Sequence, residues 1–361
     1  MTDANLPAPQ DSRDDNFIAP RQINLPDELP PVEPPSAGMI VQLFLVPAII
    51  VAAIVGVYSL FGKVASQEMD WRQLTTDVRS GNPHVRWRGA LGLAQMLDAD
   101  AQRGSQGQHL SERPEIATAL ADLYKELIDR EILSEEELKQ IEFMSKALGR
   151  MQVPDQIVPV LFSGMESRRN HDVRKHSLIG LAMLAGTLGE NSVLRQNSRL
   201  IDRLIEISRE GDPLFRHQAA FNLGLIPNPV TMERLTELLE DPDQMVRANA
   251  AIGLARNGKT NGLPVFHELF QEAADWKLNP SMVTTSEQEA TYFERMLMLL
   301  NSIKAVSQLQ PQLSAAEQAT FADEMQIVST STRDAVLRTD AMELLHQLQP
   351  ATAKTGKAVK E

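Results

Sequence analysis

Five segments of the same form recur along this chain, and they limit its fold more than any other feature. Each contains an apolar residue, an arginine directly after it, a small residue three positions after the arginine, and a leucine seven positions after it. The segments are VRWRGALGLA from Val85, VRKHSLIGLA from Val173, FRHQAAFNLG from Phe215, VRANAAIGLA from Val246 and LRTDAMELLH from Leu337. Offsets of three and seven lie on one face of a helix, so the small residue permits close approach of a neighbouring helix and the leucine fills the contact. The pattern predicts stacked helices.

The spacing of these segments indicates further copies. Their arginines are separated by 88, 42, 31 and 91 positions, and the long gaps are about two periods of roughly 40 to 47 residues, the repeat length of two-helix solenoids. A degenerate copy fits each long gap: Ser134–Met151, with Ser134 as the expected N-cap, and Phe293–Val306. The sequence therefore predicts about seven helix pairs.

The partner helices and the helix starts are also readable. The segments RLIDRLIEIS from Arg199 and PEIATALADLYKELI from Pro114 each place their aliphatic residues on one face. A capping side chain precedes a proline at Asn82-Pro83, Asp212-Pro213 and Asp241-Pro242, which predicts a helix start at each. The stretches 99–114 and 273–289 lack the repeat pattern, and we expect loops there.

Composition supports an all-α class. Aromatic residues make up 5% of the chain, whereas sheets are enriched in β-branched and aromatic side chains. The absence of cysteine excludes a disulfide framework and a Cys-ligated zinc site. The net charge of −13 is poorly matched to polyanionic nucleic acid, so no nucleic-acid partner is expected.

The pattern Asp-Pro-x-x-x-Val-Arg-x-x-Ala-Ala-x-x-Leu, intact in DPDQMVRANAAIGL, resembles the second helix of a HEAT repeat, an armadillo-like unit. The resemblance covers most of 70–350 and implies a right-handed α-solenoid with a long concave surface that binds proteins or peptides. Together with an acidic Pro-rich tail and a single apolar span, the chain also looks like bacterial membrane-anchored HEAT-repeat proteins of unassigned activity.

The resemblance implies a structural role for the repeated arginines. In HEAT proteins this arginine usually belongs to an Asp–Arg ladder that ties adjacent repeats together. The matching positions here are Arg86, Arg174, Arg216 and Arg247, with Asp172, Asp212 and Asp241 as the expected acceptors. Replacing one of these arginines is expected to destabilise the array.

A second strong feature is the stretch 39–61, MIVQLFLVPAIIVAAIVGVYSLF, which carries no charge. At about 1.5 Å per residue it is long enough to cross a membrane as one helix. A cleaved signal peptide ending at Ser66 is the alternative, but 38 acidic, Pro-rich residues precede the stretch and its apolar core is too long. We expect a disordered tail over 1–38, a transmembrane helix over 39–61, a linker over 62–69, the solenoid over 70–350 and a disordered tail over 351–361.

Charges beside the span predict its orientation. Lys63, Arg72 and Arg79 follow the span, whereas Arg21 is the one basic residue within about 20 positions before it, so the positive-inside rule places the large domain in the cytoplasm. A domain facing the opposite compartment is the alternative. The expected location is a single-pass protein of a bacterial inner membrane, with the lipid bilayer and membrane-associated proteins as partners.

No motif predicts catalysis or a cofactor. The seven histidines form no HExxH, and there is no nucleophile elbow, Walker loop or dinucleotide-binding glycine pattern. The chain is therefore not expected to be an enzyme, and no cofactor or metal site is predicted. The sharpest local feature is the basic stretch SRRNHDVRKH, with Arg168, Arg169, Arg174, Lys175 and His176.

These observations leave two functional hypotheses. The first is a membrane-anchored HEAT-repeat scaffold that binds a partner protein or peptide at the membrane surface. The second is a membrane-tethered enzyme or a module that binds lipid headgroups, a phosphorylated partner or nucleic acid through the 168–176 cluster. For the cluster, a turn between two solenoid helices with solvated side chains is the simpler interpretation.

Overall fold

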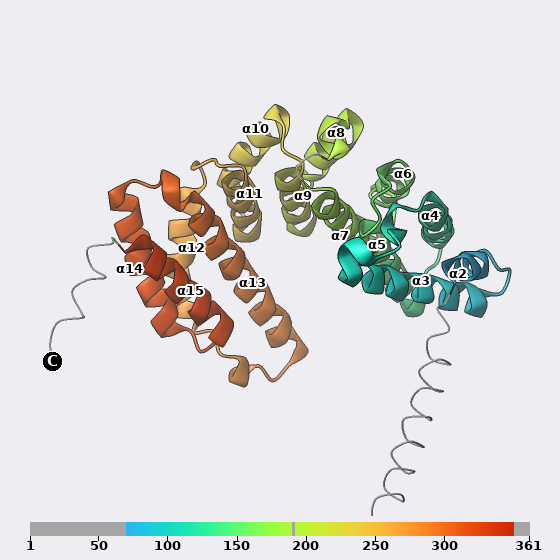
Figure 1. Ribbon diagram of the computed structural model, residues 1–361. Coiled ribbons are helices and arrows are strands. Elements are labelled where there is room, and N and C mark those ends of the chain that lie inside the picture. The colour runs from blue at the N-terminus through green and yellow to red at the C-terminus, as the bar shows by residue number, and fades with distance from the viewer. Residues whose placement is uncertain (1–69, 190–191, 350–361) are drawn as a thin grey trace, which may run out of the picture. The chain divides into compact units, whose positions relative to one another are not determined.

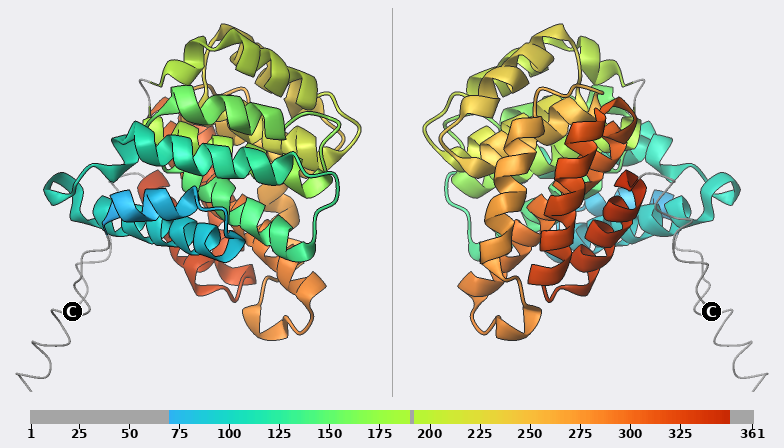
Figure 2. Two further views of the ribbon diagram at one scale, coloured as in Figure 1. Left: turned by 90° about the vertical axis from the view of Figure 1, so that its right-hand side faces the viewer. Right: turned by 90° about the vertical axis from the view of Figure 1, so that its left-hand side faces the viewer.

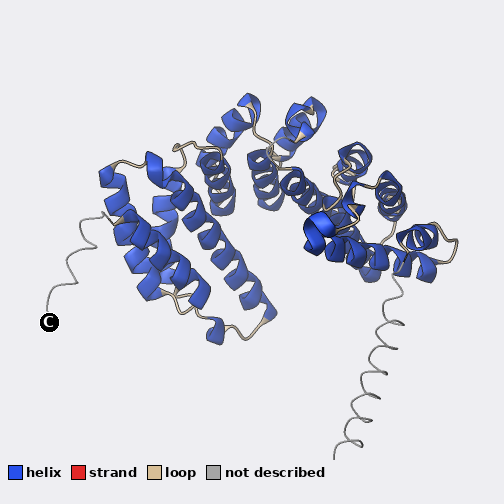
Figure 3. Cartoon of the chain, in the orientation of Figure 1, coloured by secondary structure: helices blue, strands red, loops and turns tan. Residues whose placement is uncertain are grey.

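The computed structural model describes residues 70–189 and 192–349, and every regular element in these ranges is helical (Figure 3). The α-helices are α2 (Trp71–Val78), α3 (Pro83–Arg103), α4 (Pro114–Ile128), α5 (Glu135–Gly149), α6 (Pro154–Gly164), α7 (His171–Leu188), α8 (Ser198–Ile207), α9 (Pro213–Leu225), α10 (Pro229–Glu237), α11 (Gln244–Arg256), α12 (Leu263–Trp276), α13 (Ser286–Leu309), α14 (Ala315–Ser331) and α15 (Ala335–Leu348). The predicted tail 1–38, span 39–61, linker 62–69 and C-terminal tail 351–361 lie outside the described residues.

In the part of the chain that the structure describes, consecutive helices pack as seven pairs, beginning with α2 and α3 and ending with α14 and α15. The second helices of successive pairs contact one another from α5 to α15, and we call this series the inner row. The first helices, such as α4, α6, α8 and α10, follow the other side of the array, and we call them the outer row (Figure 1). The helical class and the predicted number of pairs are confirmed.

Most helix starts lie where capping chemistry predicts them. Asn82 and Asp212 each cap a helix that has proline as its first residue. Ser134 and Glu137 form a capping box at the start of α5. The prediction at Asp241 is wrong: α11 begins at Gln244, and its N-cap is Asp243. The Asp241 side chain instead forms an ion pair with Arg216 of the preceding pair.

Both predicted loops are shorter than expected, because the helices before them continue and the second is also entered by the next helix. The helix α3 runs to Arg103 and ends where Gly104 adopts φ +53°, a conformation that glycine tolerates. Its buried residue Asp100 accepts hydrogen bonds from the backbone amides of Gln108 and, at 2.7 Å, of Leu110, which folds the loop back on the helix. In the second case α12 ends at Trp276 and α13 begins at Ser286.

The repeated small residues and leucines occupy the contacts between helices. The small residues Gly89, Ser177, Ala219, Ala250 and Ala341 are all buried. Four of the five leucines are fully buried as well, namely Leu93, Leu181, Leu223 and Leu254. Leu345 in the last pair is half-buried. The helices α9 and α11 of the inner row pack closely, since a Cβ on Gly224 would lie 2.6 Å from the Cα of Gly253.

Among the described residues, no helix is both long enough and apolar enough to cross a membrane.

Candidate functional site

Four of the repeated arginines each join their helix pair to the pair that follows. Arg86 of α3 donates to Glu126 of α4 at 2.5 Å. Arg247 of α11 donates to Glu268 of α12 at 2.5 Å. Both acceptors belong to the following pair, so these two ion pairs cross the junctions between repeats. The hydrogen bond from Arg86 lowers the pKa of the Glu126 carboxyl.

The middle of the chain shows the most regular part of this ladder. Here two repeated arginines each donate from Nη2 to a carboxylate of the following pair. Arg174 donates to Glu210 at 2.6 Å, and Arg216 donates to Asp241 at 2.9 Å. The backbone carbonyl oxygen of Glu210 accepts from Arg216 at 3.2 Å, and that of Asp241 accepts from Arg247 at 2.9 Å. Each of these two acids therefore binds the preceding arginine through its side chain and the following arginine through its main chain.

The identity of the acceptors differs from the sequence prediction. Only Asp241, of the three predicted aspartates, accepts from a ladder arginine, and the remaining acceptors are glutamates. Asp212 caps α9 and lies 3.1 Å from His171, while Asp172 is half-exposed near His171. The physical reason is position: Glu210 and Asp241 stand six residues before the next arginine, outside the helix, where they face the preceding pair.

The pair Arg216–Asp241 is the most enclosed of the series. The side chains of Arg216 and Asp241 are 13% and 8% exposed, and the second contact, from Nε, is also 2.9 Å. Burial alone would raise the pKa of Asp241, but the hydrogen bonds from Arg216 and from the amide of Asp243 lower it. The same contact with Asp241 raises the pKa of Arg216. Two parallel hydrogen bonds between ions make this the strongest type of side-chain contact in the ladder.

The basic stretch 168–176 does not form one convergent surface. Arg168 is exposed and donates to Glu166 at 2.7 Å. Arg169 is buried and donates to the carbonyl of Ile128 and to Asp129. Arg174 belongs to the ladder and also stacks on a phenylalanine ring. Two of the three arginines of the stretch, Arg169 and Arg174, thus form ion pairs with carboxylates of neighbouring helix pairs, which agrees with a turn between two solenoid helices.

The other two residues of the stretch lie on α7. Lys175 is half-buried, and His176 is half-buried next to it. Burial lowers the pKa of His176, although Glu142 of α5 opposes this effect. A neutral imidazole adds nothing to an anion site at neutral pH. Among the described residues, Lys175 is the one cation of this stretch without an ion pair, because Arg168 is bound to Glu166, and a single lysine is a weak basis for anion binding.

A second series of arginines, which the sequence analysis missed, joins the outer row. Arg203 of α8 donates to the carbonyl of Met165 at 2.8 Å, and Arg234 of α10 donates to that of Ser208 at 2.9 Å. Both acceptors follow the C-terminal end of the preceding outer helix, where unpaired carbonyls favour a cation. Each donor is the sixth residue of its helix, and this shared position is the signal that could have revealed it.

The candidate binding site is an apolar groove on the inner row, with a volume of about 530 Å³. It spans α7, α9, α11 and α13, which lie side by side in Figure 1. Its apolar lining includes Ile179, Met183, Phe221, Met245, Ile252, Leu297 and Met298. Leu297 has 53% of its surface exposed. An open apolar surface of this kind on a folded chain marks a place where another molecule binds.

The groove carries few polar groups. These are His217, Gln218, Asn249, Glu294 and Asn301. Burial lowers the pKa of His217, so its imidazole is neutral at pH 7. Glu294 is exposed and forms no ion pair within the described part of the chain. The groove therefore offers an apolar surface with amide and imidazole hydrogen-bonding groups and one free carboxylate, which suits a largely apolar protein segment.

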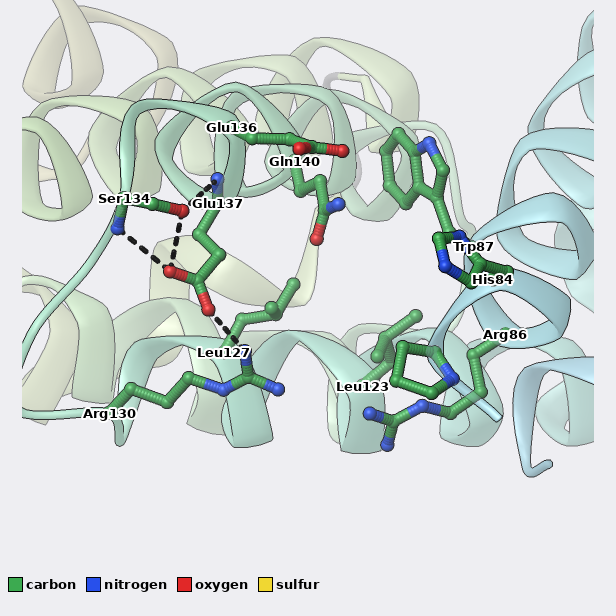
Figure 4. Close-up of a pocket in the computed structure, with 11 residues that line it drawn as sticks. His84, Arg86, Trp87, Leu123, Leu127, Arg130, Ser134, Glu136, Glu137 and Gln140 are labelled. Carbon is green, nitrogen blue, oxygen red and sulfur yellow. Dashed lines mark hydrogen bonds and ion pairs between the residues drawn. The ribbon is translucent and has the colours of Figure 1, made fainter. Parts of the chain in front are cut away.

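A smaller pocket of about 300 Å³ lies between α3, α4 and α5 (Figure 4). Glu137 accepts from the backbone and hydroxyl of Ser134 at 2.7 and 2.8 Å and also from Arg130. Hydrogen bonds from the amide and hydroxyl of Ser134, and then from Arg130, lower the pKa of Glu137 to about 2. Arg86, also at this pocket, is bound by its ladder glutamate. Arg86, Arg130 and Glu137 of this pocket are thus bound by neighbouring side chains of the protein itself.

Catalytic chemistry finds no support in the geometry of the described residues. Across 70–189 and 192–349, no three His, Asp or Glu side chains gather as they would around a metal ion. The best-defined dyad joins His267 to Glu324, with Nδ1 2.9 Å from Oε1, and the imidazole stacks on the ring of Phe321. Within the described ranges, no hydroxyl or thiol nucleophile forms a hydrogen bond with this histidine.

Comparison with known proteins agrees with this architecture. Residues 201–279, which cover α8 to α12, match the family model described as HEAT repeats. This match confirms the resemblance on which the repeat pattern was interpreted. No curated protein matches the chain.

Three of the solved structures that are similar to the chain are engineered proteins. One engineered protein is 15% identical, with 77% of this chain and 96% of that chain covered and a TM-score of 0.33. A designed armadillo repeat protein is 14% identical, with 71% and 100% covered and a TM-score of 0.32. A further engineered protein is 16% identical, with 79% and 90% covered and a TM-score of 0.31. Likeness at this level carries no information about function.

Proposed function

We propose that this chain, a HEAT-repeat protein by its match over residues 201–279, is a scaffold that binds a partner protein through the groove on its inner row. The observation that carries the proposal is the groove itself, an apolar surface across four helices to which α13 contributes the exposed Leu297. Repeat arrays present long continuous surfaces of this kind to protein partners. The proposal assigns no reaction and no cofactor to the chain.

The chemistry of the groove specifies what such a partner presents. Four inner-row helices packed at about 9 to 10 Å span roughly 30 Å, which equals about 20 residues of helix. Aliphatic or aromatic side chains of the partner would fill the space around Phe221 and Leu297. A basic side chain would pair with Glu294. A partner segment with an apolar face and one lysine or arginine therefore matches the site.

The proposal includes a membrane anchor. Its support is the uncharged stretch 39–61, which is long enough to span the hydrocarbon core. The basic residues after this stretch favour a cytoplasmic solenoid. Membranes from cells that express the full chain are washed with alkaline carbonate. An anchored chain stays in the pellet, and release of the chain into the supernatant contradicts this part of the proposal.

The binding function is tested by partner capture in native membranes. Leu297→Glu and Phe221→Asp place a charge in the apolar groove, and we expect at least a tenfold loss of crosslinked partner. Val193→Glu, at an exposed position away from the groove, is the control. Equal capture by all three variants and the original chain would refute the groove as the binding site. Charge reversal at Arg168 tests the alternative anion site, and we expect it to leave capture unchanged.

A further inference from the structure

The last helix pair leaves partly exposed a face whose equivalent is buried in earlier repeats. In four repeats the leucine seven positions after the arginine has at most 1% of its surface exposed, because the neighbouring helices enclose it. Leu345, at the same repeat position, is half-buried because no helix pair follows α15 in the described residues. The surface around Leu345 therefore corresponds to a contact between repeats, but no described helix covers it.

This face is a groove with its own lining. It lies between α14 and α15, has a volume of about 430 Å³, and is lined by Ala319, Ala322, Leu345 and Leu348 together with Gln318, Asp323, Gln326 and Gln349. Met342, one turn before Leu345 on α15, is 56% exposed. The right-hand view of Figure 2 shows these two red helices facing outward at the end of the array. Together, α14 supplies a shallow surface of alanines and α15 supplies a ridge of larger side chains.

We propose that this face pairs with the same face of a second copy of the chain. The first argument is self-complementarity. A two-fold axis places the α15 ridge of one copy against the alanines of α14 in the other, and it does so twice. The side chains of α15 that would fill the groove of one copy thus belong to a helix that borders the same groove in the other copy. This inference is independent of the partner groove on the inner row.

The opposite end of the array gives the second argument. The exposed side chains of α2 are Arg72, Gln73 and Thr76, and the exposed Arg79 follows directly after the helix, so all four are polar or charged. Stacking this end on the C-terminal face would bury two arginines against a groove whose lining has Asp323 as its one carboxylate, so at least one guanidinium would lose its water without an acidic partner, which is costly. Head-to-tail association is therefore disfavoured. The residues that follow α15, PATAKTGKAVKE, contain three lysines and a single large aliphatic residue, and they match the apolar face no better.

The size of the face sets the strength of the pairing. The 17 residues of α14 and the 14 residues of α15 give helices about 25 and 21 Å long. Two such helices at about 10 Å spacing offer a footprint of roughly 500 Å² per copy, below the roughly 800 Å² of a standard stable interface. The dimer is therefore reversible and depends on concentration. Confinement of the anchored chain to a membrane would favour it.

Crosslinking through single cysteines tests the proposal, because the chain contains no cysteine of its own. The full chain with Ala319→Cys is treated in membranes with a short bis-maleimide. We expect a product of twice the chain mass. Thr76→Cys, on the polar end, is the matched control and should stay monomeric. Failure of Ala319→Cys to crosslink at any expression level, or equal crosslinking of Thr76→Cys, would overturn the proposal.

A second change separates this face from random collisions. Adding Ala322→Arg or Met342→Glu to Ala319→Cys should reduce crosslinking at least tenfold. Met342→Glu lies at an exposed position, so it leaves the helix content seen by circular dichroism unchanged and distinguishes lost pairing from lost folding. Undiminished crosslinking in both variants would refute the interface. Leu297→Glu, in the other groove, should leave crosslinking intact, so the two proposals fail separately.

Discussion

Replacing Arg216 with alanine tests the strongest contact of the ladder. The change removes two hydrogen bonds of 2.9 Å to Asp241 and the bonds to the carbonyls of Glu210 and Gly211. It also leaves the carboxylate of Asp241, which is 8% exposed, without its cation. Removing one partner of such a buried pair costs about 3 kcal/mol, because the remaining charge keeps its desolvation penalty. We expect that loss in the free energy of unfolding at pH 7.

The matched control is Arg338→Ala. Arg338 holds the same repeat position in α15, but it is exposed and makes no ion pair within the described residues. We expect its replacement to change stability by less than about 0.5 kcal/mol. Urea unfolding of the full chain in detergent micelles, followed by circular dichroism, measures both. Equal stability of the two variants would show that the ladder contributes nothing.

The same variant has a defined pH dependence. The folded-state pKa of Asp241 is lowered, so its ion pair stabilises the fold above the ordinary pKa of about 4 and loses this effect as the pH falls further. The difference between the original chain and Arg216→Ala should therefore be full at pH 7 and shrink below pH 4. A difference that grows on acidification would contradict the assignment.

Three further predictions follow from the contacts between helices. Gly224→Ala should destabilise the fold by about 2 kcal/mol in urea unfolding, because its Cβ would press on the facing backbone of α11, whereas Gly186→Ala, with open space around it, should not destabilise. Burial lowers the pKa of His176 and His217, so the unfolded chain binds more protons and stability should fall as the pH drops below about 6.5. In a variant with both histidines replaced by glutamine, the free energy of unfolding should stay constant between pH 7 and 5, whereas that of the original chain should fall. Arg247→Ala should cost about 1 to 2 kcal/mol, less than Arg216→Ala, because its carboxylate partner is 45% exposed, and an unchanged melting temperature would remove this arginine from the ladder.

The sequence predicted the helices and their pairing because each signal is local. The capping box at Ser134 and the aliphatic faces of α4 and α8 involve residues within one or two turns, and such patterns survive in a single sequence. The lengths of the two loops were less accurate. Asp100 holds the first of them through contacts eight and ten residues away, which no helical periodicity encodes.

The acceptors of the ladder and the groove were harder to predict for the same reason. Glu126 and Glu210 stand 40 and 36 positions from their arginines, so their identity depends on how one pair stacks on the next. The helix α11 is apolar or small on most of its faces, with buried Val246 and Leu254 and with Met245 in the groove. Sequence alone cannot separate a core face from a binding face when both are apolar.

The inner-row ladder runs in one direction, and this decides how the array tolerates shortening. Each of its arginines donates to an acceptor in the following pair, from α3 to α4 and onward to α11 and α12. Truncation after α11 would leave the guanidinium of Arg247 without Glu268, whereas truncation after α13 breaks none of these ladder bonds. Deletion of α2 and α3, or of all helices up to α7, would instead leave a carboxylate without its ladder arginine. The boundaries of shortened variants should therefore be chosen so that each ladder arginine keeps the carboxylate of the following pair, and not only by where helices end.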